Sequence, residues 1–133
     1  MENCIFCKII KNDLPCYSVY DDGDFMAFLD IRPLNLGHIL LIPKTHFRWV
    51  DDVPNFGAYF ELAKKIGLAQ RKVLGAESVA YITAGYGVDH AHIHIIPRYE
   101  NDGHGDVPHG DKIKIFSDQM MAETAEKLRK EVS

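Results

Sequence analysis

The sequence predicts an α+β fold with a mostly antiparallel sheet of five strands. Short apolar runs separated by turn residues follow one another along the first third of the chain. Helical periodicity marks one long central segment and one C-terminal segment. One face of the sheet should lie against the long helix, which leaves the other face for chemistry or a partner. The length fits one domain over residues 1–133.

The strands are bounded by turn residues and prolines. Acidic residues around Gly23 separate two apolar runs, which is a hairpin signal. Pro43 stops a continuous apolar segment typical of a buried strand, and Pro97 ends the last strand. The five expected strands are residues 19–20, 25–29, 38–42, 79–83 and 90–96.

Both helices carry start and stop signals. Pro54 opens the central helix, Gly75 lies just past its end, and Ser117 can cap the last helix. Apolar residues at helical spacing are Phe56, Tyr59, Ala63, Ile66 and Val73 in the first, and Met121, Ala125, Leu128 and Val132 in the second. A polar, glycine-rich loop occupies residues 99–112, of which residues 99–111 are expected to rim the pocket, and its histidines are assigned no role.

Composition argues against several classes of partner. The net charge is −4, because 19 acidic residues outnumber 15 Lys and Arg residues, and so little positive charge disfavours nucleic-acid binding. No apolar run is long enough to span a membrane, and no basic leader with an apolar stretch opens the sequence. We therefore expect a cytoplasmic protein with neither a nucleic-acid nor a membrane partner.

Three histidines alternate with apolar residues at His90, His92 and His94. In a strand, alternate side chains point to the same face, so all three imidazoles should share one side of the sheet. Imidazole titrates near neutral pH and can act as ligand, acid, base or nucleophile. A single metal ion bound by all three is a strained alternative, because second neighbours on a strand lie roughly 6.5–7 Å apart.

Two of the three cysteines form Cys4-x-x-Cys7, while Cys16 stands alone. In a reducing compartment this spacing indicates half of a metal site or a redox pair. The redox reading is disfavoured, because the pair does not follow a strand of a βαβ unit. Tetrahedral zinc commonly takes two close cysteines and two histidines from elsewhere.

The triad with its flanks, His90–Arg98, resembles the signature of the histidine-triad (HIT) superfamily, in particular its bacterial Hint/Fhit-like branch. The segments 4–10, 28–33 and 37–46 resemble further blocks of that family, so the resemblance covers nearly the whole chain. It implies a HIT-like fold, a purine nucleotide or nucleotide conjugate as ligand, and a homodimer in which one sheet continues across both subunits.

The resemblance also implies catalytic roles. His92 would attack the α-phosphorus and form a nucleotidyl-histidine intermediate, later released by water or another acceptor. His94 and His38 would donate hydrogen bonds to phosphate oxygens whose charge grows in the transition state. From the residues alone, a buried histidine of a strand is the favoured reading of His38.

For the nucleoside, the resemblance implies that Asp30 accepts both ribose hydroxyls, although Asp30 could also form a turn before Pro33. The base would occupy an apolar slot, for whose residues core packing is the alternative: Phe6, Leu14, Phe28 and Ile31. The resemblance further implies a structural zinc ion with four ligands: Cys4, Cys7, His46 and His90.

The sequence departs from the family just before the triad. Tyr86 stands where family members carry Gln, and Gly87 replaces a hydroxyl residue. Both positions normally touch the phosphates or the leaving group, so we expect a smaller leaving-group site or weaker catalysis. The candidate substrates are nucleoside phosphoramidates, acyl adenylates and dinucleoside polyphosphates. The main alternative is a nucleotide-binding regulatory or scaffold protein with little turnover.

Overall fold

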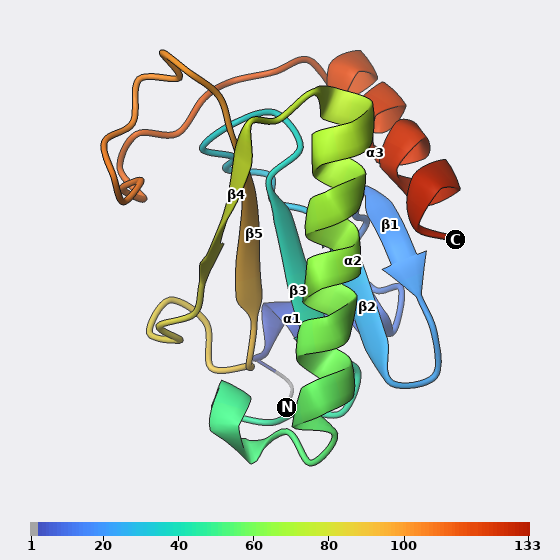
Figure 1. The fold of residues 1–133 in the computed structure, drawn as a ribbon. Coiled ribbons are helices and arrows are strands. Elements are labelled where there is room, and N and C mark those ends of the chain that lie inside the picture. The colour runs from blue at the N-terminus through green and yellow to red at the C-terminus, as the bar shows by residue number, and fades with distance from the viewer. Residues whose placement is uncertain (1–2) are drawn as a thin grey trace.

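The computed structural model describes residues 3–133 and contains one five-stranded sheet of order β1-β2-β3-β5-β4 (Figure 1). Every neighbouring pair of strands is antiparallel. The expected α+β fold with an antiparallel sheet is therefore confirmed. The strands are β1 Ser18–Asp21, β2 Phe25–Leu29, β3 Ile39–Pro43, β4 Ser78–Ile82 and β5 Ile93–Arg98.

In the part of the chain that the structure describes, three α-helices accompany the sheet: α1 Ile5–Ile10, α2 Phe56–Leu74 and α3 Asp118–Val132, with a short 3-10 turn η1 at Val50–Asp52. The helices α2 and α3 were expected. The helix α1 was not, since we expected the first third of the chain to form strands. It has only six residues, and the Cys4 side chain caps it by accepting the Cys7 N–H.

The sheet is covered on both faces, as Figure 1 shows, with α2 and α3 on one side and α1 on the other. The strand residues alternate between two apolar clusters. In β3, Ile39 and Leu41 pack in the large cluster with α2 and α3, whereas Leu40 and Ile42 pack with α1 in a smaller cluster. This alternation fixes which side chains the sheet presents toward α1.

Local signals explain how the two long helices begin and end. Pro54 lies two residues before α2, and Gly75 ends it in the left-handed conformation at φ 70°. Ser117 accepts the Met120 N–H and so caps α3 as expected. Gly67, inside α2, lets the Tyr81 hydroxyl of β4 approach, since a Cβ there would collide with it. Within residues 3–133, no helix is long and apolar enough to cross a membrane.

Candidate active site and metal cluster

The triad lies at the start of β5, but the regular strand begins at Ile93 and not at His90 as expected. The backbone before Ile93 is satisfied by other partners: the Ala91 N–H donates to the Phe47 carbonyl at 2.7 Å, and Thr83 Oγ1 donates to the His92 carbonyl at 2.8 Å. These bonds replace a strand ladder and hold this segment in place.

The alternation of side chains persists through this irregular segment. Ala91, Ile93 and Ile95 are buried in the large cluster beneath α2 and α3. The His92 ring lies on the α1 side, where its centroid is 5.4 Å from that of Phe6 and 5.2 Å from that of His94. The histidines therefore share one face, as the spacing predicts.

His92 is oriented by a backbone carbonyl. Its Nδ1 lies 2.7 Å from the His90 carbonyl oxygen, which can only accept, so Nδ1 carries the hydrogen. The neutral ring then has its lone pair on Nε2. A neutral imidazole nitrogen with its tautomer fixed in this way is a competent nucleophile.

His38 and His94 form a hydrogen-bonded pair. The Leu34 N–H donates to His38 Nδ1 at 3.1 Å, so the hydrogen of the neutral His38 ring lies on Nε2. That Nε2 is 2.9 Å from His94 Nδ1, which accepts, and the His94 hydrogen therefore lies on Nε2. His38 is only 2% exposed and its donor is already used. Its contribution in this arrangement passes through His94.

Burial favours the neutral forms of both rings. It lowers the pKa of His38 to about 4, against a smaller opposing influence of the Asp30 carboxylate. Burial also lowers the pKa of His94, and the neighbouring His92 ring lowers it further. Both rings are therefore neutral near pH 7, which is the state in which the tautomers above apply.

Asp30 lies beside this pair. One carboxylate oxygen accepts the Arg32 N–H at 2.9 Å, and the other is 3.6 Å from His38 Nε2. The side chain thus forms the local turn with one oxygen and keeps the second toward the histidines. The turn is one of the two roles expected for Asp30. The other role, acceptance of both ribose hydroxyls, stays a prediction.

The four apolar residues expected around the base divide into two groups. Phe6, Leu14 and Phe28 share the cluster under α1, and the rings of Phe6 and Phe28 meet edge to face at 5.7 Å. Ile31 is 71% exposed and borders a separate cavity of about 180 Å³ beside residues 113–116.

The two cysteines of α1 meet two histidines from distant parts of the chain. Sulfur–nitrogen distances are 3.4 Å for Cys4–His90, 3.2 Å for Cys7–His46 and 3.6 Å for Cys7–His90. All four ligand atoms lie within 4.8 Å of one another. Tetrahedral zinc with bonds of about 2.3 Å to sulfur and 2.0 Å to nitrogen separates its ligands by roughly 3.3–3.8 Å. The donor set and its spacing fit that ion.

The tautomer of His90 also suits a metal ligand. Its Nε2 donates to the Pro43 carbonyl at 2.8 Å, which leaves the Nδ1 lone pair directed at the two sulfurs. Burial raises the pKa of the Cys7 thiol to about 11, and the bond to Cys4 adds to this effect. A bound cation would reverse the shift, because a coordinating thiol is deprotonated.

A third group holds the loop that carries Tyr86 and Gly87. Arg48 donates to the Gly85 carbonyl at 2.7 Å and stacks 3.7 Å above the Trp49 ring. Tyr86 is 82% exposed and meets Trp49 edge to face at 5.6 Å. Gly87 borders an open groove beside His46. Sequence reasoning did not single out Arg48 or Trp49, whose partners lie about 37 positions further along the chain.

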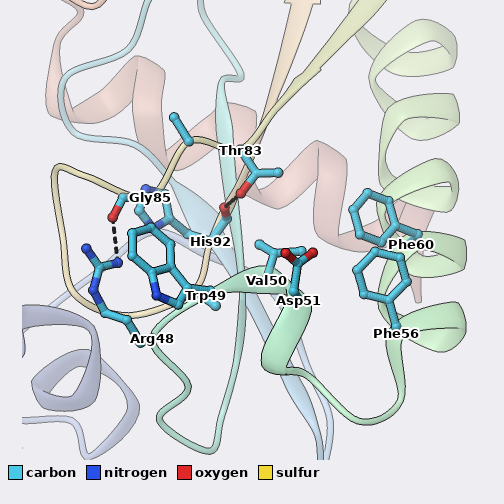
Figure 2. A pocket seen from close by; sticks show the side chains of 11 residues that line it. Arg48, Trp49, Val50, Asp51, Phe56, Phe60, Thr83, Gly85 and His92 are labelled. Atoms are coloured by element: carbon cyan, nitrogen blue, oxygen red, sulfur yellow. Dashed lines mark hydrogen bonds between the residues drawn. The ribbon is translucent and has the colours of Figure 1, made fainter.

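A cavity of about 240 Å³ lies next to this loop (Figure 2). Figure 2 shows Phe56 and Phe60 of α2 on the side opposite Trp49, with Thr83 and His92 between them. Its wall therefore combines aromatic side chains with the segment that carries the triad.

An antiparallel sheet with aligned histidines on one face, next to a Cys/His cluster, defines a histidine-triad architecture. The family model described as HIT domain matches residues 11–101, and this chain belongs to the HIT family. The resemblance noted from the sequence is thereby confirmed.

Relatives of this chain include proteins with and without a named activity. An uncharacterized HIT-like protein of Borreliella burgdorferi is 41% identical over 86% of this chain and 88% of its own length. The adenosine 5'-monophosphoramidase hnt1 of Schizosaccharomyces pombe is 37% identical over 72% of this chain and 74% of its own. A zinc-bound histidine triad family protein of Mycobacterium smegmatis superposes with a TM-score of 0.80, at 29% identity, over 98% of this chain and 94% of that one.

Proposed function

We propose that this protein is a nucleotide hydrolase or nucleotidyl transferase that acts at the α-phosphorus of purine nucleotide conjugates. The observation that carries the proposal is the bond from His92 Nδ1 to the His90 carbonyl, which leaves Nε2 as a nucleophile. In the first step Nε2 bonds to phosphorus, the bond from phosphorus to the leaving group breaks, and the leaving group takes a proton from solvent. In the second step water attacks phosphorus and returns a proton to solvent, the phosphorus–nitrogen bond breaks, and the nucleoside monophosphate is released.

The neighbouring groups have distinct roles in this proposal. His94 Nε2–H donates to a phosphate oxygen, and His38 holds the His94 ring so that this nitrogen keeps its hydrogen. The Asp30 carboxylate accepts both ribose hydroxyls. The base lies against the apolar cluster of Phe6 and Phe28, against which Leu14 also packs. Ile31, which is exposed outside that cluster, is the fourth residue proposed to contact the base.

The relative from Schizosaccharomyces pombe, a named phosphoramidase, supports nucleoside phosphoramidates as the first substrates to test. Acyl adenylates and dinucleoside polyphosphates are further candidate substrates, because their cleavage would also break a bond to the α-phosphorus. A second candidate function, nucleotide binding with little turnover, is favoured by one observation. Tyr86 faces solvent and Gly87 has no side chain, so neither supplies the amide and hydroxyl that the family pattern has there.

We also propose that zinc is bound by Cys4, Cys7, His46 and His90 as a structural ion. It would fix α1 and the start of the triad segment together, because its ligands come from both. The zinc-bound structural relative supports this assignment.

A homodimer through β4 forms part of the same proposal. β4 is an edge of the sheet, and Tyr81 on it and Leu68 on α2 are 46% and 50% exposed. An edge strand beside apolar side chains can pair with its copy and extend the sheet. The proposed dimer is a cytoplasmic protein formed of one HIT-like domain per chain.

The test is AMP release from an adenosine phosphoramidate by the wild type and by His92→Ala, without chelator. We expect AMP from the wild type alone. When the substrate carries a label on its adenosine and the reaction is quenched early, we also expect the label on the wild-type protein, as the nucleotidyl-histidine adduct. His109→Ala, on an exposed loop, is the matched control and should keep full activity. Equal AMP release by wild type and His92→Ala would contradict the assigned nucleophile.

A further inference from the structure

The bond that sets the His38 tautomer depends on a short segment, Pro33–Asn35. This segment presents the Leu34 N–H to His38 Nδ1 at 3.1 Å. The opposite side of the segment is held by the chain from residue 99 to residue 114, where the Lys114 N–H donates to the Pro33 carbonyl at 2.7 Å. The position of the Leu34 N–H is thus set by contacts outside the triad.

His104 makes the closest of these contacts to Leu34 itself. Its Nε2 lies 2.7 Å from the Leu34 carbonyl oxygen, so Nε2 carries the hydrogen and donates. The other ring nitrogen, Nδ1, is buried and has no hydrogen-bond partner among the described residues. A buried nitrogen without a hydrogen-bond partner destabilises the folded protein. The bond from Nε2–H to Leu34 is therefore the hydrogen bond that accounts for an imidazole at this position.

His104 is held firmly by its own neighbours. The Asp102 carboxylate accepts three hydrogen bonds. The donors are the backbone N–H of His104 at 3.0 Å, the side-chain amide of Asn35 at 2.9 Å and the guanidinium of Arg98 at 2.9 Å. Arg98 keeps the pKa of the Asp102 carboxyl far below its usual range, so this acceptor stays charged. The imidazole therefore has a fixed base from which to hold Leu34.

We infer that His104 is a positioning residue for the triad. Three hydrogen bonds connect it to His94: His104 holds the Leu34 carbonyl, the Leu34 N–H fixes His38, and His38 Nε2–H fixes His94. Without the first bond, the peptide that carries the Leu34 N–H is still held at the Pro33 carbonyl by the Lys114 N–H, but it is no longer held on the far side of Leu34. The Leu34 N–H can then turn away, and His38 can carry its hydrogen on Nδ1 instead. His94 would then carry its hydrogen on Nδ1 and turn a lone pair toward the phosphate. This inference rests on the proposed function, since it assigns His94 as the donor.

Two substitutions separate the hydrogen bond from the bulk of the ring. His104→Gln places an amide nitrogen at the position of Nε2 and keeps a donor to Leu34, whereas the shorter His104→Asn does not reach. His109→Asn, in the same loop but exposed, is the matched control. Each variant is compared with the wild type by thermal melting before the functional measurements.

The first readout is the protonation of ring nitrogens in the ligand-free protein, measured by ¹⁵N NMR, which is independent of turnover. We expect the wild type, His104→Gln and His109→Asn to carry hydrogen on Nε2 of His38 and His94, and His104→Asn to show mixed tautomers. The second readout is AMP release, for which His104→Asn should lose on the order of tenfold in kcat with KM unchanged.

Unchanged tautomers in His104→Asn would overturn the inference, even if its activity or melting temperature falls. Mixed tautomers in His104→Gln, equal to those in His104→Asn, would overturn it as well. If the wild type releases no AMP, the proposed function is contradicted, and the tautomers alone then support or overturn the role of His104.

Discussion

The Nε2–H of His38 donates to Nδ1 of His94, 56 positions further along the chain, and the two nitrogens are 2.9 Å apart. Asp30 lies beside the pair, and the Leu34 N–H donates to His38. The tautomers of the two rings therefore depend on groups from separate segments of the chain. This contact turns two of the predicted catalytic histidines into one unit, in which only His94 can face a substrate with a free donor.

The buried His38 makes stability depend on pH. Its folded pKa of about 4 is below the unfolded value of about 6.5, so its contribution is fully present above pH 6.5 and is lost as pH falls toward 4. The shift corresponds to roughly 3 kcal/mol of unfolding free energy. His38→Asn, which can still accept the Leu34 N–H, should be less stable at pH 7.5 but lose less on acidification. Urea unfolding of both proteins at pH 7.5 and 4.5 measures this, and equal losses would contradict it.

Zinc content should follow the two cysteines of α1. We expect about one zinc ion per wild-type chain and a large loss in Cys4→Ser, because a hydroxyl is a poor replacement for a thiolate. Free zinc at a hundred times its Kd would add about 2.7 kcal/mol to the unfolding free energy. Cys16→Ser, outside the cluster, should keep its zinc. Elemental analysis measures the zinc content of each protein, and thermal unfolding with and without chelator measures the stabilisation by zinc. A wild-type zinc content in Cys4→Ser would refute the site.

Restoring the family pattern before the triad should raise turnover. Tyr86→Gln supplies an amide that can donate toward the leaving group, and we expect kcat to increase at least about tenfold. Tyr86→Phe keeps the edge contact with Trp49 and should leave kcat unchanged. Steady-state AMP release distinguishes the variants. No gain from Tyr86→Gln would show that this position does not limit the rate.

The proposed dimer can be broken from α2. Leu68→Glu places a charge beside the edge strand β4 and should give monomers, because a charge buried in an interface is costly. Ile115→Glu changes a residue that is 92% exposed and lies far from β4 in the sequence, and it should leave the assembly intact. Sedimentation velocity reports the mass of each, and a wild-type monomer would contradict the dimer.

The sequence predicted which side chains share a face of the sheet, because successive side chains of a strand point to opposite faces. His92 and His94 point away from Ala91 and Ile93 even where the ladder is interrupted. The start of β5 was not predictable, because the carbonyl of His90 bonds to the ring of His92 and not to a strand. Such a contact depends on a side chain, and local propensity does not register it.

The helix α1 was missed for a related reason. Six residues are too few for a helix to be stable by propensity, and this one is held by its packing and by the contacts of Cys4 and Cys7 with distant histidines. The resemblance named these four residues, and the structure brings them together. The pairing of His38 with His94 and the support from His104 depend on tertiary contacts that no short motif contains.

Trp49 is the chain's single tryptophan, and its ring contacts both the Arg48 guanidinium and the Tyr86 ring at the loop next to the triad. Its indole therefore reports optically on this loop without any attached dye. Titration with a nucleotide while its emission is recorded therefore tests whether a ligand reaches this loop.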